Sequence, residues 1–367
     1  MYKYFVLIAV FFSTFLDAQD VEVKVAQDSL RFKKIKTVKW DTTKYRKYNY
    51  VFIVGVFNQY RDFNNEIIQE INKDSLHLSN QTYVAESNVT GGLSISYDKF
   101  QINLGTRTKP REDQQGKGYT KMFNIGFNFG DNRWVSENYY RRFKGFYNKS
   151  TPNFDTNYKH TNAYYLQPNM SSSLFMSRLL YFSNYENFSY KSGFGSNFRQ
   201  LKSAFTWIIG VNYSAYTMLN DSSVIPIQAR HLFNDYAQMR GLKSFNIGGT
   251  FGAAATIVVF KAWFINGHFS FGPEIQNRNY DFTTHSRRIS YIGASGIGRF
   301  SMGLNLNKFY FLVSINNDYN LYNSKKIIKI KSEAITHNLT LGWRFNSGEP
   351  IGFYRKFQQT RLYKLFG

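Results

Sequence analysis

His268 and Ser270 are the residues whose types and spacing could most directly support catalysis. They stand two positions apart, so their side chains would lie on one face of a β-strand. An imidazole next to a hydroxyl can act as a general base and make the hydroxyl a nucleophile. The pair therefore gives one hypothesis, an acyl hydrolase.

Other reaction centres are not indicated by the sequence. The chain has no cysteine, which excludes disulfides, a thiol nucleophile and thiolate metal sites. The remaining five histidines show no metal-ligand spacing, and no glycine-rich phosphate loop or paired-carboxylate motif occurs. We therefore expect no metal and no cofactor.

Many segments of the chain alternate between apolar and polar side chains. In residues 119–130 the odd positions are almost all aromatic or aliphatic, and the even ones are mostly small or polar. A strand that faces lipid on one side and water on the other requires this period of two. The 36 Phe, 28 Tyr and only six Pro fit an all-β, antiparallel transmembrane β-barrel.

Turn residues divide this barrel into strands, and the connections between the strands differ in length. Tight turns are expected at Asp98-Lys99, 130–132 and 307–308, and long polar connections at 61–82, 106–118, 148–168, 276–289 and 322–331. The segments give about 12 strands. Fourteen is the alternative if 225–239 adds a strand or 188–219 forms one hairpin.

The N-terminus has the pattern of an export signal. Lys3 precedes the apolar run Phe5–Phe15, and Ala18 offers a cleavage site. The run is shorter than the roughly 20 residues that a spanning helix needs. We expect residues 1–18 to be a signal peptide, 19–47 a periplasmic lead, 48–345 the barrel and 346–367 a periplasmic tail.

The formal net charge of +22 also has to be explained. The basic residues are scattered through alternating segments, with no basic helix and no groove-reading motif, so nucleic acid is not an expected partner. Anionic lipopolysaccharide and outer-membrane lipid are the expected partners, together with envelope proteins that the sequence does not identify. The expected location is the bacterial cell outer membrane.

Several segments resemble a family of Bacteroidetes-type outer-membrane proteins of unknown function. They are Tyr140–Tyr147 (YRRFKGFY), Phe188–Lys191 (FSYK), Gln200–Ser203 (QLKS), Asp221–Pro226 (DSSVIP) and the closing Gly342–Phe345 (GWRF). The resemblance spans about residues 48–345 and implies a barrel in the outer membrane. It carries no activity and no site residues.

Alternation also selects candidates for the inside of the barrel. His268 and Ser270 lie opposite Phe269 and Phe271, so they are expected to face the lumen. The outer-membrane lipid hydrolases that share this spacing turn the pair toward lipid, so we interpret His268 and Ser270 as a lumen-lining polar pair, with catalysis as the alternative. Glu137 and Arg141 share a face and could form an ion pair in the lumen; the alternative is that residues 134–147 extend above the membrane.

The connection 219–243 mixes apolar residues with Arg230 and Arg240. It could fold into the lumen, lie over the barrel mouth, or form a surface loop or an extra hairpin. The sequence therefore supports a passive pore or a structural or accessory component of the envelope, with an outer-membrane lipid or lipopolysaccharide acyl hydrolase as the alternative.

Overall fold

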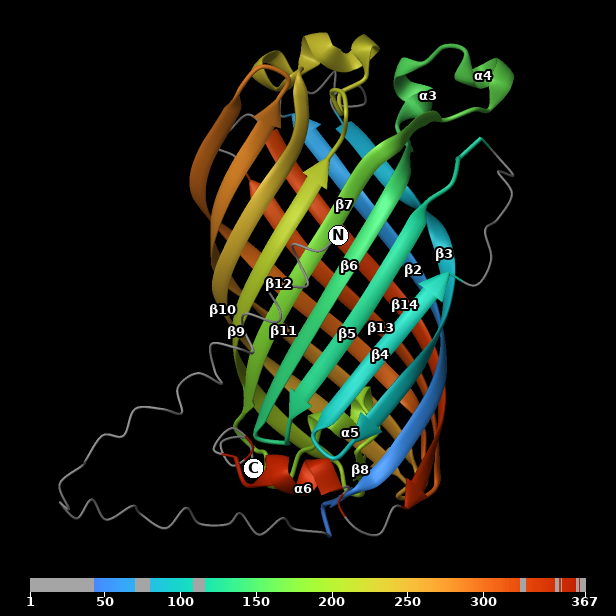
Figure 1. Cartoon of the computed structure of the whole chain (residues 1–367), viewed down its shortest axis with the longest axis vertical. Helices are drawn as coiled ribbons and strands as arrows, with labels where there is room; N and C mark the ends of the chain where they lie inside the picture. The colour runs from blue at the N-terminus through green and yellow to red at the C-terminus, as the bar shows by residue number, and fades with distance from the viewer. Residues whose placement is uncertain are drawn as a thin grey trace, which may run out of the picture. The chain divides into compact units, whose positions relative to one another are not determined.

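Twelve antiparallel strands form a closed barrel (Figure 1). The computed structural model describes residues 43–69, 80–107, 116–323, 328–346, 350, 352–360 and 363. The strands are β2 (Val51–Gln69), β3 (Asn80–Tyr97), β4 (Phe100–Arg107), β5 (Lys121–Gly130), β6 (Trp134–Asn148), β7 (Tyr165–Phe182), β9 (Ala204–Leu219), β10 (Met239–Val259), β11 (Trp263–Phe282), β12 (Ser286–Asn305), β13 (Phe309–Asn323) and β14 (Ile328–Asn346). Pairing of β14 with β2 closes the ring. The predicted all-β barrel is confirmed, with twelve strands and not fourteen.

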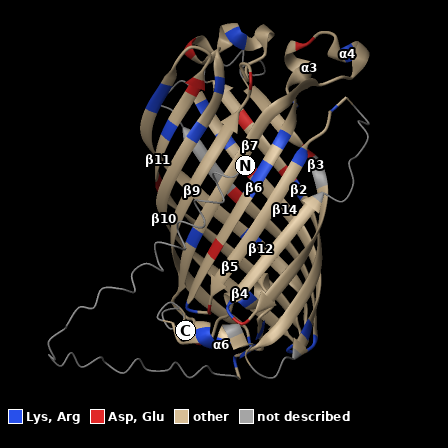
Figure 2. Cartoon of the chain, viewed as in Figure 1, with Lys and Arg blue, Asp and Glu red and all other residues tan. Residues whose placement is uncertain are grey.

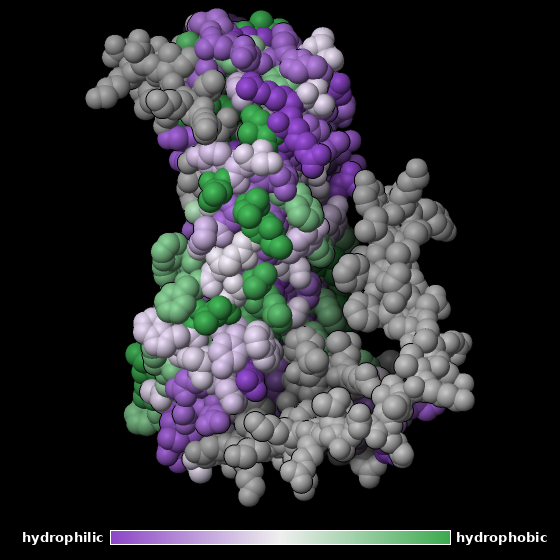
Figure 3. Space-filling view, turned by 90° about the vertical axis from the view of Figure 1, so that its left-hand side faces the viewer, coloured by the Kyte–Doolittle hydropathy of each residue, from purple (hydrophilic) through white to green (hydrophobic). Residues whose placement is uncertain are grey.

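Alternation in the sequence becomes the two faces of the wall. On β5, Phe123 is exposed on the outside, whereas its neighbours Met122 and Asn124 are buried inside. The outward positions of the other strands, except β6, carry exposed Phe, Ile, Leu, Val and Trp side chains. Hydrophobic residues gather over the middle of the barrel in the face shown in Figure 3. Charged residues gather toward the ends in Figure 2.

The two ends of the barrel differ in their connections. At one end, here called the proximal end, β3–β4, β5–β6, β10–β11 and β12–β13 are joined by turns of two or three residues. The helix α6 (Gly352–Gln358) also lies there, at the bottom of Figure 1. The opposite, distal end carries the connection between β6 and β7, with the short helices α3 (Thr151–Phe154) and α4 (Tyr158–Thr161).

Several connections are shorter than the sequence analysis predicted. β11 and β12 leave only residues 283–285 between them, so the predicted long connection at 276–289 is wrong. β13 and β14 likewise cover most of 322–331, and β2 and β3 cover most of 61–82. The cause is that side chains become polar on both faces here while backbone pairing continues, as in Asn279↔Arg288.

At the distal end, the connection 220–238 folds into the mouth of the barrel. It contains the 3₁₀ helices η3 (Ile227–Leu232) and η4 (Asn234–Tyr236) and no strand, so an extra hairpin here was wrong. Pro226 has no backbone N–H to donate to a neighbouring strand, and it is the N-cap of η3. We call the buried apolar residues of this connection the distal plug; they are Val224, Ile225, Ala229, Phe233 and Tyr236.

At the proximal end, the connection 183–203 forms a second plug, here called the proximal plug. It contains α5 (Tyr190–Phe194) and β8 (Phe198–Gln200), and β8 pairs with β1 (Tyr45–Lys47) outside the barrel sheet. The alternative of one hairpin over 188–219 is therefore wrong. Gly193 allows α5 to lie against β11, because a Cβ there would come within 2.6 Å of the Asn266 side chain.

The predicted segment boundaries are only partly covered by the structure. Residues 1–18, expected to be a signal peptide, lie outside the described residues, as do residues 19–42 of the expected lead. Residues 45–47 of that lead form β1, and the expected tail contains α6. None of the helices among the described residues is long and apolar enough to cross a membrane.

Candidate functional site

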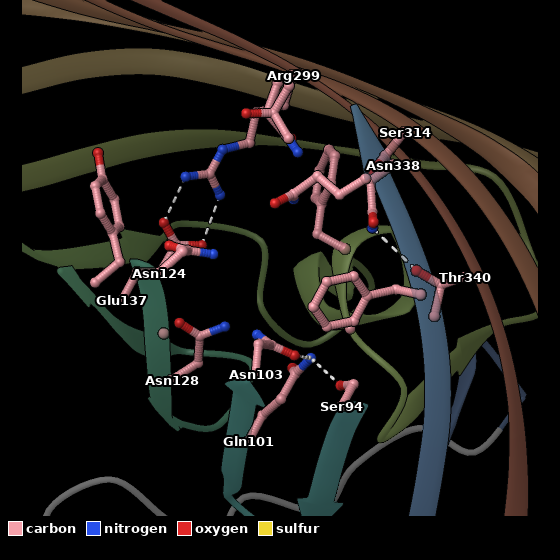
Figure 4. A pocket seen from close by; sticks show the side chains of 18 of the residues that line it. Ser94, Gln101, Asn103, Asn124, Asn128, Glu137, Arg299, Ser314, Asn338 and Thr340 are labelled. Carbon is pink, nitrogen blue, oxygen red and sulfur yellow. Dashed lines mark hydrogen bonds and ion pairs between the residues drawn. The ribbon is translucent and has the colours of Figure 1, made fainter. Parts of the chain in front are cut away.

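A polar chamber lies in the lumen between the two plugs (Figure 4). Its volume is about 190 Å³, and it is lined by side chains from β2, β3, β4, β5, β6, β12, β13 and β14, with Phe194 and Gly195 from the proximal plug. Half of the lining residues are Asn, Gln, Ser or Thr, and five are charged. No group of residues suited to hold a metal ion occurs in the part of the chain that the structure describes.

Glu137 on β6 anchors one side of the chamber. Its Oε1 and Oε2 accept hydrogen bonds from Nη1 and Nη2 of Arg299 on β12, at 2.6 and 2.7 Å (Figure 4). The hydroxyl of Tyr190 in α5 also donates to Oε1, at 2.7 Å. This two-pronged ion pair crosses the lumen and at the same time holds α5 in place.

Asp318 on β13 forms the second charged centre. Its Oδ2 lies 3.0 Å from Nη1 of Arg141, and its Oδ1 lies 3.0 Å from Nη1 of Arg178. The Tyr139 hydroxyl donates to Oδ2 at 3.2 Å. One carboxylate is thus shared by two buried guanidinium groups.

Arg61 on β2 is buried in the wall of the same chamber and forms no ion pair with a carboxylate of the described residues. Its Nη2 donates to Oε1 of Gln59 at 2.6 Å, and its Nε donates to Oγ1 of Thr336 at 3.1 Å. Its Nη1 lies 3.9 Å from Sδ of Met122. All of these partners are neutral.

The structure places all four predicted site residues on the lumen side of the wall. Glu137 and Arg141 do not pair with each other, because each reaches a partner on another strand, Arg299 and Asp318 respectively. His268 Nε2 lies 3.1 Å from Ser270 Oγ, but both side chains are buried.

Three features argue against catalysis by the His268–Ser270 pair. The ring of Tyr190 in α5 packs edge-on against His268, with centroids 5.6 Å apart. His268 Nδ1 has no hydrogen-bond partner among the described residues, so no carboxylate orients the imidazole. The pair also faces the lumen, away from an acyl chain in the membrane.

Sequence reasoning missed Arg61, Arg178, Arg299, Asp318 and Tyr190. The alternation that places Ser301 and Gly303 in the lumen also places Arg299 there, so this residue could have been found. Arg61 was missed because it stands at the start of a predicted connection. Tyr190 had no signal, since α5 is a single short turn of helix.

Two lysines of the proximal end have altered acidity. Lys191 in α5 donates to the carbonyls of Gly130 and Lys99, at 2.5 and 3.2 Å, and burial lowers the pKa of Lys191 to about 8. Lys99 donates to the Tyr363 carbonyl at 2.9 Å, and burial lowers the pKa of Lys99 to about 8 as well. The proximal end therefore contains two lysines, one of them in the proximal plug, whose pKa lies well below the usual value for lysine.

Solved structures with a similar arrangement are bacterial membrane barrels. The outer membrane protease OmpT from Escherichia coli is 8% identical, with 80% of this chain and 97% of that chain covered and a TM-score of 0.36. The Pseudomonas putida toluene transporter TodX is 5% identical, with 81% and 90% covered and a TM-score of 0.27. A Pseudomonas aeruginosa FadL homologue is 9% identical, with the same coverages and a TM-score of 0.26.

These likenesses say nothing about activity, given their low identities and TM-scores. None of the curated proteins matches the sequence. A family model for a domain of unknown function, DUF4421, matches residues 39–345, which include the whole barrel and both plugs. The chain therefore belongs to the DUF4421 family.

Proposed function

We propose that this protein is a bacterial outer-membrane β-barrel that its own chain closes at both ends, and that it serves as a structural or accessory component of the cell envelope. A passive pore is the function that this proposal replaces. The observation that carries it is the presence of two separate plugs, one of apolar residues at the distal end and one built around α5 at the proximal end.

The outer surface supports a place in the membrane. Soluble monomers rarely expose a continuous apolar patch larger than a few hundred Å², whereas exposed aromatic and aliphatic side chains occupy outward positions on eleven of the twelve strands, all except β6. Short turns at the proximal end match the periplasmic end of such barrels. A Bacteroidetes-type origin remains a prediction from the sequence.

Lipopolysaccharide is the expected lipid partner. Lys121 on β5 and Lys144 on β6 are both exposed and stand directly opposite each other, on the distal side of the apolar Phe123 and Ile125. Like charges in this position repel each other. A lipid phosphate at the membrane surface would relieve this repulsion.

Flux through the protein in liposomes tests the closed state. Purified protein should leave the swelling rate of liposomes in small sugars and amino acids at the level of protein-free liposomes. An open porin reconstituted at the same density provides the positive control. Swelling as fast as with the porin would contradict the proposal.

A lipid acyl hydrolase is the second candidate, favoured by the 3.1 Å contact between His268 Nε2 and Ser270 Oγ. Because the pair is buried beneath Tyr190, we expect Ser270→Ala to leave the acyl chains of lipid A and phospholipids unchanged. Mass spectrometry of envelope lipids measures this. A change in acylation that Ser270→Ala abolishes, and that Ser295→Ala does not, would establish the hydrolase instead.

A further inference from the structure

We propose that the polar chamber is a binding site for one small oxyanion, held chiefly by Arg61. The chemical class is a free inorganic phosphate or a small carboxylate, since both present oxygens to guanidinium groups in the same way.

The first argument is charge. Three arginines line the chamber, namely Arg61, Arg141 and Arg299. A fourth, Arg178, forms an ion pair with Asp318, which also lines the chamber. Glu137 and Asp318 form ion pairs with three of them. The next buried carboxylate, Glu274, interacts more strongly with a fifth arginine, Arg278, than with Arg178, so Glu274 and Arg278 together add no net charge. The cluster therefore has an excess of two positive charges inside the barrel, where an uncompensated ion is costly.

The second argument is the position of Arg61. Glu137 is used by Arg299, and Asp318 is divided between Arg141 and Arg178, so neither carboxylate is left for Arg61. The Arg61 side chain is 3% exposed, and its hydrogen-bond partners among the described residues are the neutral Gln59, Thr336 and Met122. A buried guanidinium group in this state lacks the counter-charge that buried arginines normally have.

The third argument is the space in front of these groups. The chamber has a volume of about 190 Å³, which is enough for several water molecules or for a small anion with some of them. Its lining supplies further donors, among them the amides of Asn124, Asn128 and Asn338. Nε of Arg141 and Nε of Arg299 are buried and have no hydrogen-bond partner among the described residues.

The size of the ligand follows from the two plugs. The distal plug is apolar. At the other end, Phe194 of α5 and the adjacent Gly195 form the floor of the chamber. A lipid headgroup attached to its acyl chains could not enter between them, so the ligand is a free small anion. Because the plugs cover both ends of the lumen, we expect the anion to exchange slowly with solvent.

Equilibrium dialysis of the purified full-length barrel against radiolabelled phosphate, or against radiolabelled acetate, measures the occupancy. We expect about one anion per barrel after long incubation or after refolding in its presence. Binding of either anion supports the site, and the anion bound more tightly identifies the class. Binding of neither would overturn the proposal.

Gln59→Glu is the decisive variant. It places a carboxylate where the Gln59 amide oxygen now accepts a hydrogen bond from Arg61 at 2.6 Å, so the protein itself would supply the missing charge. We expect at least a tenfold loss of anion affinity, with heat-modifiable gel migration retained as proof of folding. Undiminished binding in a folded Gln59→Glu barrel would overturn the proposal.

Arg288→Met is the matched control. Arg288 is exposed on β12 near the distal end and does not line the chamber. This variant removes one positive charge from the barrel surface and should bind the anion as the unmodified protein does. An equal loss of binding in Arg288→Met would show adventitious surface binding and would overturn the internal site.

Discussion

At the distal end, the connection 220–238 closes the lumen with apolar side chains that pack against lumen-facing Phe63, Phe143 and Met218. At the proximal end, the connection 183–203 combines an apolar cluster, which includes Phe188 and Tyr190, with polar and charged contacts to the wall that the distal plug largely lacks. Arg344 donates to the Ser196 carbonyl, and Ser301 donates to the Gly193 carbonyl. The distal contact depends on the exclusion of water, which pH and salt hardly affect, whereas charged contacts respond to both.

The contacts of the two plugs indicate which of them would respond more readily to a change in pH. Apolar packing gives no means of switching near neutral pH, and the residues of the distal plug are almost completely buried. The proximal plug contains Lys191, whose pKa burial lowers to about 8, and its α5 is held by the shared carboxylate of Glu137. We therefore expect the distal plug to be the more permanent and the proximal plug the more responsive.

Phe233→Ala should give the largest effect on stability. Phe233 is fully buried in the distal plug, and its removal leaves a cavity, so the free energy of unfolding should fall by about 3–5 kcal/mol. Ile227→Ala in the same connection is the control, because Ile227 is 72% exposed and its loss should cost well under about 1 kcal/mol. Urea unfolding in detergent measures both. Equal losses would contradict the apolar seal.

Glu137→Gln should weaken the floor of the chamber. It leaves the buried Arg299 without its carboxylate, and loss of one partner of such a pair costs about 3 kcal/mol. Glu66→Gln breaks the partly exposed pair with Lys331, at 3.3 Å, and should cost less than about 1 kcal/mol. The same unfolding measurement separates them. A loss for Glu137→Gln as small as that for Glu66→Gln would mean that α5 is held by other contacts.

The change in stability over any one pH unit should be the smallest of the three effects, because the contribution of the two lysines is spread over more than two pH units. Lys99 and Lys191 have a lower pKa in the folded barrel than in the unfolded chain, so the unfolded chain binds more protons between pH 8 and 10. The free energy of unfolding should therefore rise across this range. Lys191→Met should reduce the slope, whereas the exposed control Lys202→Met should leave it unchanged. A free energy of unfolding that falls between pH 8 and 10 would contradict these lowered pKa values.

Alternation was sufficient to predict the wall of the barrel. Wherever one face must contact lipid and the other the lumen, each residue is fixed to one side, as Phe123 and Asn124 show. The rule fails beyond the apolar band, where β11 continues through Asn277 and Asn279 with polar residues on both faces. There only backbone hydrogen bonds define the strand, and they leave no pattern in the sequence.

The candidate site was predictable only in part for a related reason. Alternation gives the side of the wall on which Glu137 and Arg141 stand, but not which residue faces them across the lumen. The pairing with Arg299 and Asp318 depends on the diameter of the barrel and the register of distant strands. The proximal plug was missed because its short elements, α5 and β8, are too brief to show a period.

The most direct test of the two-plug account is conductance in planar bilayers. The unmodified protein should be silent, and so should each variant in which Gly-Ser linkers replace only residues 224–236 or only residues 188–200. The variant with both replacements should show stable conductance, provided that its gel migration remains heat-modifiable. Steady conductance by the unmodified protein, equal to that of the double variant, would contradict the account.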